Sequence, residues 1–97
     1  MAWLSGADGL DQACHTLHGV LKRWMDLIKK HRGPRPDDKT FPSMEAFVSG
    51  CRKLPPAAVR CMIPELLEQH RAACNSYLDN ISKEDRAKVD AFRATLL

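Results

Sequence analysis

The chain has 97 residues, enough for one domain but too few for two separate hydrophobic cores. Hydrophobic residues make up 44% and charged residues 28% of the sequence, so the composition argues against wholesale disorder. The net charge of +3 is modest, and runs of alternating Val, Ile and Thr are absent. These features predict a single helical domain over residues 1–97.

Residues 6–32 are predicted to form one long helix around which the rest of the chain is organised. Apolar residues recur at helical spacing along it: Leu10, Cys14, Leu17, Leu21, Trp24 and Ile28. Ser5 or Asp8 is the expected N-cap, and Gly33 is the expected stop. Such a helix, roughly 38 Å long, exceeds the roughly 32 Å diameter of a compact domain of this size. We therefore expect its overhang to contact a second copy or a partner.

Four further segments complete the predicted fold: a proline-rich linker over 33–42, a short helix over 44–53, a longer helix over 56–79 and a C-terminal helix over 83–96. Ser43 and Ser82 are the expected N-caps of the second and last helices. Pro64 lies inside the longer helix, where we expect a kink or two abutting helices. The predicted fold is an all-α, four- or five-helix bundle.

The four cysteines, Cys14, Cys51, Cys61 and Cys74, show no C-x-x-C pairing. Each lies on or near an apolar helical face, where a thiol behaves as a small hydrophobic group. We predict reduced thiols in a cytoplasmic protein, because no signal-peptide pattern or membrane-spanning stretch is found in the sequence. Two disulfides in one of three pairings are the open alternative.

One constellation favours metal chemistry: Cys14 and His18 are four residues apart, and so are His70 and Cys74. Two facing helices could complete a zinc tetrahedron from these residues, but the tight turns that usually supply cysteines to zinc are missing. His15 adjoins Cys14 without facing it on a helix, and no phosphate-binding or hydrolase motif is present. We predict neither enzymatic activity nor a metal or cofactor.

Basic residues cluster toward the end of the first helix, with only Asp26 against them: Lys22, Arg23, Lys29, Lys30, Arg32 and Arg35. A solvated helix face that complements the helix dipole explains most of this cluster. A small nucleic-acid-binding regulator that uses this basic end is the alternative function, with phosphate contacts free of sequence preference. A membrane-surface role is not expected.

Protein binding accounts best for the surplus of apolar helical faces in so short a chain. We predict a regulatory module of the anti-activator, inhibitor or chaperone type that docks an apolar helical face on a partner protein, as a homodimer. In general character, without a shared motif, the chain resembles small bacterial regulatory proteins of these types. The predicted partner-binding residues are Trp3, Leu4, Leu17, Leu21, Trp24 and Ile28, with Lys29, Lys30 and Arg32 at the rim.

Overall fold

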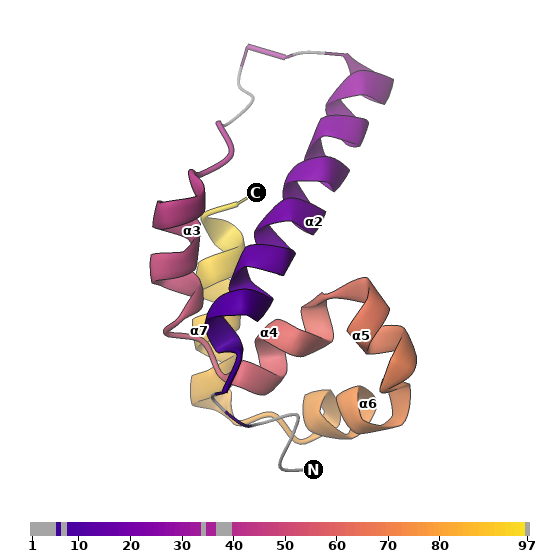
Figure 1. The fold of residues 1–97 in the computed structure, drawn as a ribbon, viewed down its shortest axis with the longest axis vertical. Coiled ribbons are helices and arrows are strands. Elements are labelled where there is room, and N and C mark those ends of the chain that lie inside the picture. Colours follow the sequence, from indigo (N-terminus) through magenta and orange to yellow (C-terminus); the bar gives the residue numbers. More distant parts are fainter. Residues whose placement is uncertain (1–5, 7, 34, 37–39, 97) are drawn as a thin grey trace.

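A computed structural model describes residues 6, 8–33, 35–36 and 40–96 of the chain. These residues form α-helices and no strand (Figure 1): α2 (Leu10–Arg32), α3 (Met44–Cys51), α4 (Pro56–Met62), α5 (Pro64–Gln69), α6 (Arg71–Asp79) and α7 (Lys83–Ala94). The all-α class and the long N-terminal helix predicted from the sequence are confirmed. The described residues contain six helices instead of four or five, because the segment over 56–79 breaks twice.

The helix α2 begins at Leu10, four residues later than predicted. Its N-cap is Gly9, whose φ of 78° places it in the left-handed region that glycine adopts without steric cost. Ser5, one of the two expected N-caps, lies outside the described residues. At the other end, Gly33 has a φ of 83° and donates its N–H to the carbonyl of Lys29 at 2.8 Å, so the predicted stop is confirmed.

The segment before α2 is held against α4 by a buried arginine. The Arg60 guanidinium donates to the main-chain carbonyls of Gly6 at 2.5 Å and Asp8 at 2.6 Å. Arg60 is only 5% exposed, so these charge-assisted bonds satisfy polar groups that burial would otherwise leave costly.

The helices α3 and α7 begin as the sequence predicts. The Ser43 hydroxyl accepts the N–H of Ala46 at 3.2 Å, and the Ser82 hydroxyl accepts that of Asp85 at 3.1 Å. Each helix ends two residues before its predicted boundary. After α3, the N–H of Lys53 bonds back to the carbonyl of Gly50 at 3.2 Å, which closes a turn.

The predicted helix over 56–79 consists of α4, α5 and α6. The first break falls at Ile63, which is extended (ψ 114°) because the following Pro64 disfavours helical geometry in the residue before it. Pro64 then occupies the first turn of α5. The second break, at His70, was not predicted. It turns α6 back toward α4, as Figure 1 shows at the lower end of the molecule.

The core lies where the N-terminal part of α2 meets α3 and α4. Its buried members are Cys14, Leu17, Phe47, Val48, Cys51, Leu54, Val59 and Ile63. A smaller cluster of Ala57, Cys61 and Cys74 joins α4 to α6. Phe41, near the end of the linker, packs its ring 5.0 Å from that of His18, and His18 bonds to the carbonyl of Pro42 at 2.9 Å. Linker residues 34 and 37–39 lie outside the described residues.

All four cysteines form disulfides, so the prediction of reduced thiols is wrong for this structure. Cys14 pairs with Cys51 and Cys61 with Cys74, with Cα atoms 6.0 and 5.6 Å apart. The first bond joins α2 to α3 and the second joins α4 to α6. The cysteines lie on apolar faces as expected, but those faces meet in pairs that only the packing of the helices reveals.

The fold is elongated, measuring 43 × 24 × 24 Å along its principal axes. A 23-residue helix is about 35 Å long, so α2 cannot fit within either short dimension. Figure 1 shows its last turns extending beyond the ends of α3, α4 and α7. Within the described ranges, no helix combines the length and apolar character that a membrane span needs.

Candidate functional site

The two halves of α2 differ in burial. The inner half (residues 10–20) contains all the buried residues of the helix, namely Cys14, Leu17 and His18. The outer half (residues 21–32) contains none, and its side chains are half-buried or exposed. Trp24 is 55% exposed and Leu27 is 50% exposed. Large apolar side chains are therefore presented where α2 leaves the rest of the fold.

The structure separates the residues predicted to bind a partner into three groups. Leu17 is fully buried and belongs to the core, so it is removed from the predicted surface. Leu21 and Ile28 are half-buried, whereas Trp24 is exposed. Of the predicted rim, Lys29 is half-buried, while Lys30 and Arg32 are exposed. Trp3 and Leu4 lie outside the described residues.

A shallow hollow lies on the outer half, with a volume of about 470 Å³. Its lining residues are Trp24, Leu27, Ile28, His31 and Arg32. Leu27 was not predicted as a partner-binding residue. It lies beside the apolar stripe of α2, where an apolar residue is expected to widen the face that packs on the core. Its spacing of three from Trp24 was the available signal, since residues three apart are neighbours on a helix.

Positive charge is concentrated on the outer half of α2. Lys22, Arg23 and Lys30 are exposed on the same half of the helix, where Asp26 is the one acidic residue. The Arg32 guanidinium donates to the carbonyl of Gly33 at 3.2 Å and so covers the negative end of the helix dipole. The outer half thus combines an apolar hollow that Arg32 lines with exposed basic residues on the same half of the helix. Apolar and polar residues combine in this way at protein-binding surfaces.

A second, deeper site opens on another side of α2. This partly open cavity, here called the α7 cavity, has a volume of about 430 Å³. Its walls come from α2, α4, α5, α6 and α7, with Phe41 and Ile81 from the connecting segments and Leu96 from beyond the end of α7. Trp24 lines both this cavity and the shallow hollow. The cavity could not be predicted from the sequence because no single helix contains its lining.

The cavity exists because α7 is attached to the fold mainly along one face. This helix contributes no buried residue. Its Phe92 ring packs edge-on against Phe47 at 5.2 Å and lies over Gly50, where a β-carbon would come within 3.4 Å of it. Phe92 therefore packs α7 against α3 on one side, while Val89 and Arg93 line the cavity on another.

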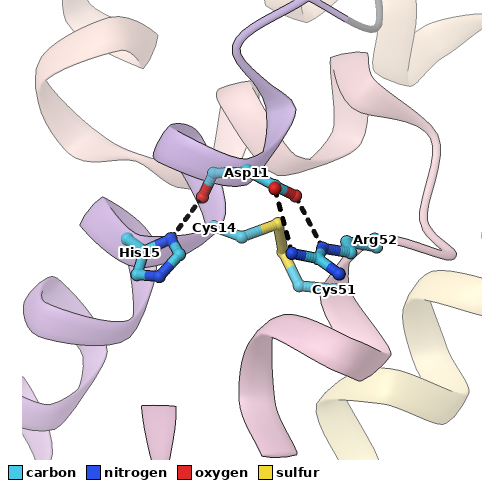
Figure 2. A network of polar contacts seen from close by, with 5 residues as sticks. All are labelled: Asp11, Cys14, His15, Cys51 and Arg52. Atoms are coloured by element: carbon cyan, nitrogen blue, oxygen red, sulfur yellow. Dashed lines mark hydrogen bonds and ion pairs between the residues drawn. A yellow bond between two sulfur atoms is a disulfide. The ribbon is translucent and has the colours of Figure 1, made fainter. Parts of the chain in front are cut away.

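A polar network joins the start of α2 to the end of α3, beside the first disulfide (Figure 2). The Arg52 guanidinium binds the Asp11 carboxylate through two bonds of 2.6 and 2.9 Å. His15 donates its Nδ1–H to the main-chain carbonyl of Asp11 at 2.7 Å. The carboxylate thus pairs with an arginine instead of orienting the imidazole, and the nearest sulfurs are bonded to each other. The network is structural and supplies no activated nucleophile.

The zinc alternative is overturned by the disulfides. Cys14 and Cys74 belong to two different bonds, so their sulfurs are not available as thiolate ligands. The His18 imidazole is instead bonded to the Pro42 carbonyl and packed between aromatic rings. The part of the chain that the structure describes contains no group of three or more potential metal ligands.

Tyr77 lies against the cluster around the second disulfide. Within the described part of the chain its buried hydroxyl has no hydrogen-bond partner. Burial, and to a smaller extent the negative charge of Asp85, raise the pKa of the Tyr77 phenol above its ordinary value. The side chain therefore stays neutral at physiological pH and acts as a packing residue.

Comparison of the chain with protein-family models, with curated proteins and with solved structures finds no match. The candidate binding sites of this protein are therefore the outer half of α2 and the α7 cavity.

Proposed function

We propose that this chain is a small, non-enzymatic protein-binding module that docks the outer half of α2 on another protein. The observation that supports this most is the exposure of Trp24 and Leu27, 55% and 50%, on the half of α2 that contains no buried residue. Tryptophan is enriched among residues that contribute most to binding energy, and exposed apolar patches with polar rims mark interaction sites. In this proposal Ile28, which lines the same hollow, extends the apolar contact, whereas Leu21 packs against the core and lines the α7 cavity.

We propose further that a second copy covers this face in a homodimer until the partner protein displaces it, and that the module acts as a regulator of the inhibitor or chaperone type. A domain of this size gains little stability from its core alone, and self-association would add to it. A regulator of this kind acts by covering a surface that its partner needs. Lys29, Lys30 and Arg32 would then set the orientation and association rate of an acidic partner.

The disulfides change the proposed location. Bonds between cysteines persist in oxidising compartments and are rare in the cytoplasm, where glutathione and thioredoxin keep thiols reduced. Two disulfides that join four of the six helices described here support an oxidising compartment. We propose such a compartment in place of the cytoplasm.

Sedimentation of the purified protein tests the homodimer. We expect a dimer for the natural chain and a folded monomer for Leu27→Glu, because the new charge lies in the apolar contact. Gln12→Glu is the matched control, since it adds the same charge at an exposed position of the inner half and should leave the dimer intact. Two basic rims repel each other, so added salt should tighten the dimer.

Two results would overturn this proposal. One is a protein that sediments as a monomer at its highest soluble concentration. The other is a Leu27→Glu variant that dimerises as well as the Gln12→Glu control.

The alternative function is nucleic-acid binding by the basic outer half. The exposure of Lys22, Arg23 and Lys30 on one half of α2 favours it. It predicts affinity for duplex DNA of any sequence that falls steeply as salt rises, because phosphate contacts release counterions. Titration of a fluorescent duplex at low salt tests it, and the absence of binding would eliminate it.

A further inference from the structure

We propose that the α7 cavity binds a single-chain amphiphile with an anionic head group, with the apolar chain inside the cavity and the head group on Arg93. This inference goes beyond the proposed protein-binding function and does not depend on it. It rests on the apolar lining of the cavity, on its volume and on the charge of its lining residue Arg93. Arg93 is not part of the shallow hollow on the outer half of α2.

The lining of the cavity is suited to a hydrocarbon chain. Twelve of its thirteen residues are apolar, and they come from every helix in the described chain except α3. Its volume of about 430 Å³ lies within the roughly 300–1,000 Å³ typical of small-molecule sites. A buried water needs about two to four polar partners, and this lining supplies few. An apolar occupant is therefore favoured over water.

The walls of the cavity are covalently reinforced. Cys61 lines the cavity from α4 and is bonded to Cys74 in α6. That bond fixes α4 and α6 relative to each other, so this part of the wall keeps its shape. The helix α7, which contributes no buried residue, forms the wall that can shift to admit a ligand.

Arg93 determines the expected head group. Among the described residues that line the cavity it is the one charged side chain, and it is exposed, in the last turn of α7. A guanidinium binds carboxylates and phosphates through paired hydrogen bonds. A cationic head group would be repelled at this position, and a neutral one would gain no ionic contact. The charge of the cavity therefore selects an anionic amphiphile, either a fatty-acid carboxylate or a single-chain phosphate.

Calorimetric titration with four ligands of equal chain length tests the proposal: decanoate, decyl phosphate, decanol and decyltrimethylammonium, each below the concentration at which it forms micelles. We expect one molecule of an anionic ligand to bind per chain, roughly ten-fold or more tightly than decanol. The cation should bind more weakly than decanol. The stronger of the two anions identifies the head group as carboxylate or phosphate.

Two pairs of variants locate the site. Arg93→Gln should reduce the affinity for the anion to that for decanol, whereas Arg86→Gln, an exposed position on the same helix outside the lining, should leave it unchanged. Val89→Phe should fill the cavity and weaken the binding of all four ligands. Ala91→Phe, which is exposed on α7 and outside the lining, should leave their binding unchanged.

The proposal is overturned if neither anion binds, if decanol binds as tightly as both anions, or if Arg93→Gln leaves anion affinity unchanged. Arg93→Gln alters an exposed side chain, so it decides the question even if Val89→Phe fails to fold. The result is also distinct from that for the homodimer, because Leu27→Glu, outside the cavity lining, should still bind the anion.

Discussion

The inner and outer halves of α2 share one apolar stripe but have opposite environments. The inner half is bonded to α3 by a disulfide and an ion pair, and its Leu17 is fully buried. The outer half carries Trp24 and Leu27 at about half exposure or more. Helical periodicity shows which face of a helix is apolar, but only the position of other elements decides whether that face is covered.

This difference explains why the two halves suit different tasks. The inner half is constrained by covalent and packing contacts, so its contribution is to stability. The outer half contains no buried side chain, so the exposed apolar area of Trp24 and Leu27 can be given to a partner. Natural proteins rarely leave large apolar side chains grouped on the surface without a binding role.

Removal of the disulfide that joins the inner half of α2 to α3 should lower the free energy of unfolding the most. The Cys14–Cys51 bond closes a loop with a sequence separation of 37, so Cys14→Ser with Cys51→Ser should lower the free energy of unfolding by about 4 kcal/mol. Urea denaturation measures the loss. The Cys61–Cys74 bond closes a shorter loop, with a sequence separation of 13. Its removal by the matched pair Cys61→Ser with Cys74→Ser should therefore lower the free energy of unfolding by about 3 kcal/mol. Equal stability of the oxidised and reduced natural protein would contradict this prediction.

A second test compares one leucine from each half. Leu17→Ala should lower the free energy of unfolding by about 3 kcal/mol, because a fully buried side chain leaves a cavity in the core. At protein concentrations too low for dimerisation, Leu27→Ala should change it by less than about 0.5 kcal/mol, since half of that side chain is in water. Chemical denaturation of both variants measures the contrast. Similar losses would show that the outer half is also part of the core.

The smallest expected effect is at the ion pair. The Asp11 and Arg52 side chains are 60% and 56% exposed, so solvent screens their attraction despite the short contact. Asp11→Asn should lower the free energy of unfolding by less than about 1 kcal/mol, and high salt should abolish the difference. Thermal denaturation at low and high salt tests this. A larger, salt-independent loss would mean that the pair orders α2 against α3.

The sequence could predict site residues only where they lie on one helix, because helical spacing then shows which residues share a face. Trp24, Ile28 and Lys30 follow from the spacing of α2, and the structure places all three on its outer half. Leu17 has the same spacing but is covered by the core, so periodicity could not separate it from them. The α7 cavity has walls from five helices, and no pattern within one segment records how such distant residues converge.

The sequence by itself determined the features that depend on neighbouring residues. The all-α class, the caps at Ser43 and Ser82 and the stop at Gly33 follow from local hydrogen bonding and backbone geometry. The break before Pro64 has the same origin, because proline restricts the residue that precedes it.

Only the tertiary structure decided the pairing of the cysteines, the break at His70 and the coverage of the α2 stripe. No residue near His70 forbids a helix, yet the chain turns there and Cys74 meets Cys61 across α4 and α6. These outcomes depend on contacts between residues far apart in the sequence. Their energies are set by which surfaces meet, and a one-dimensional pattern does not contain that information.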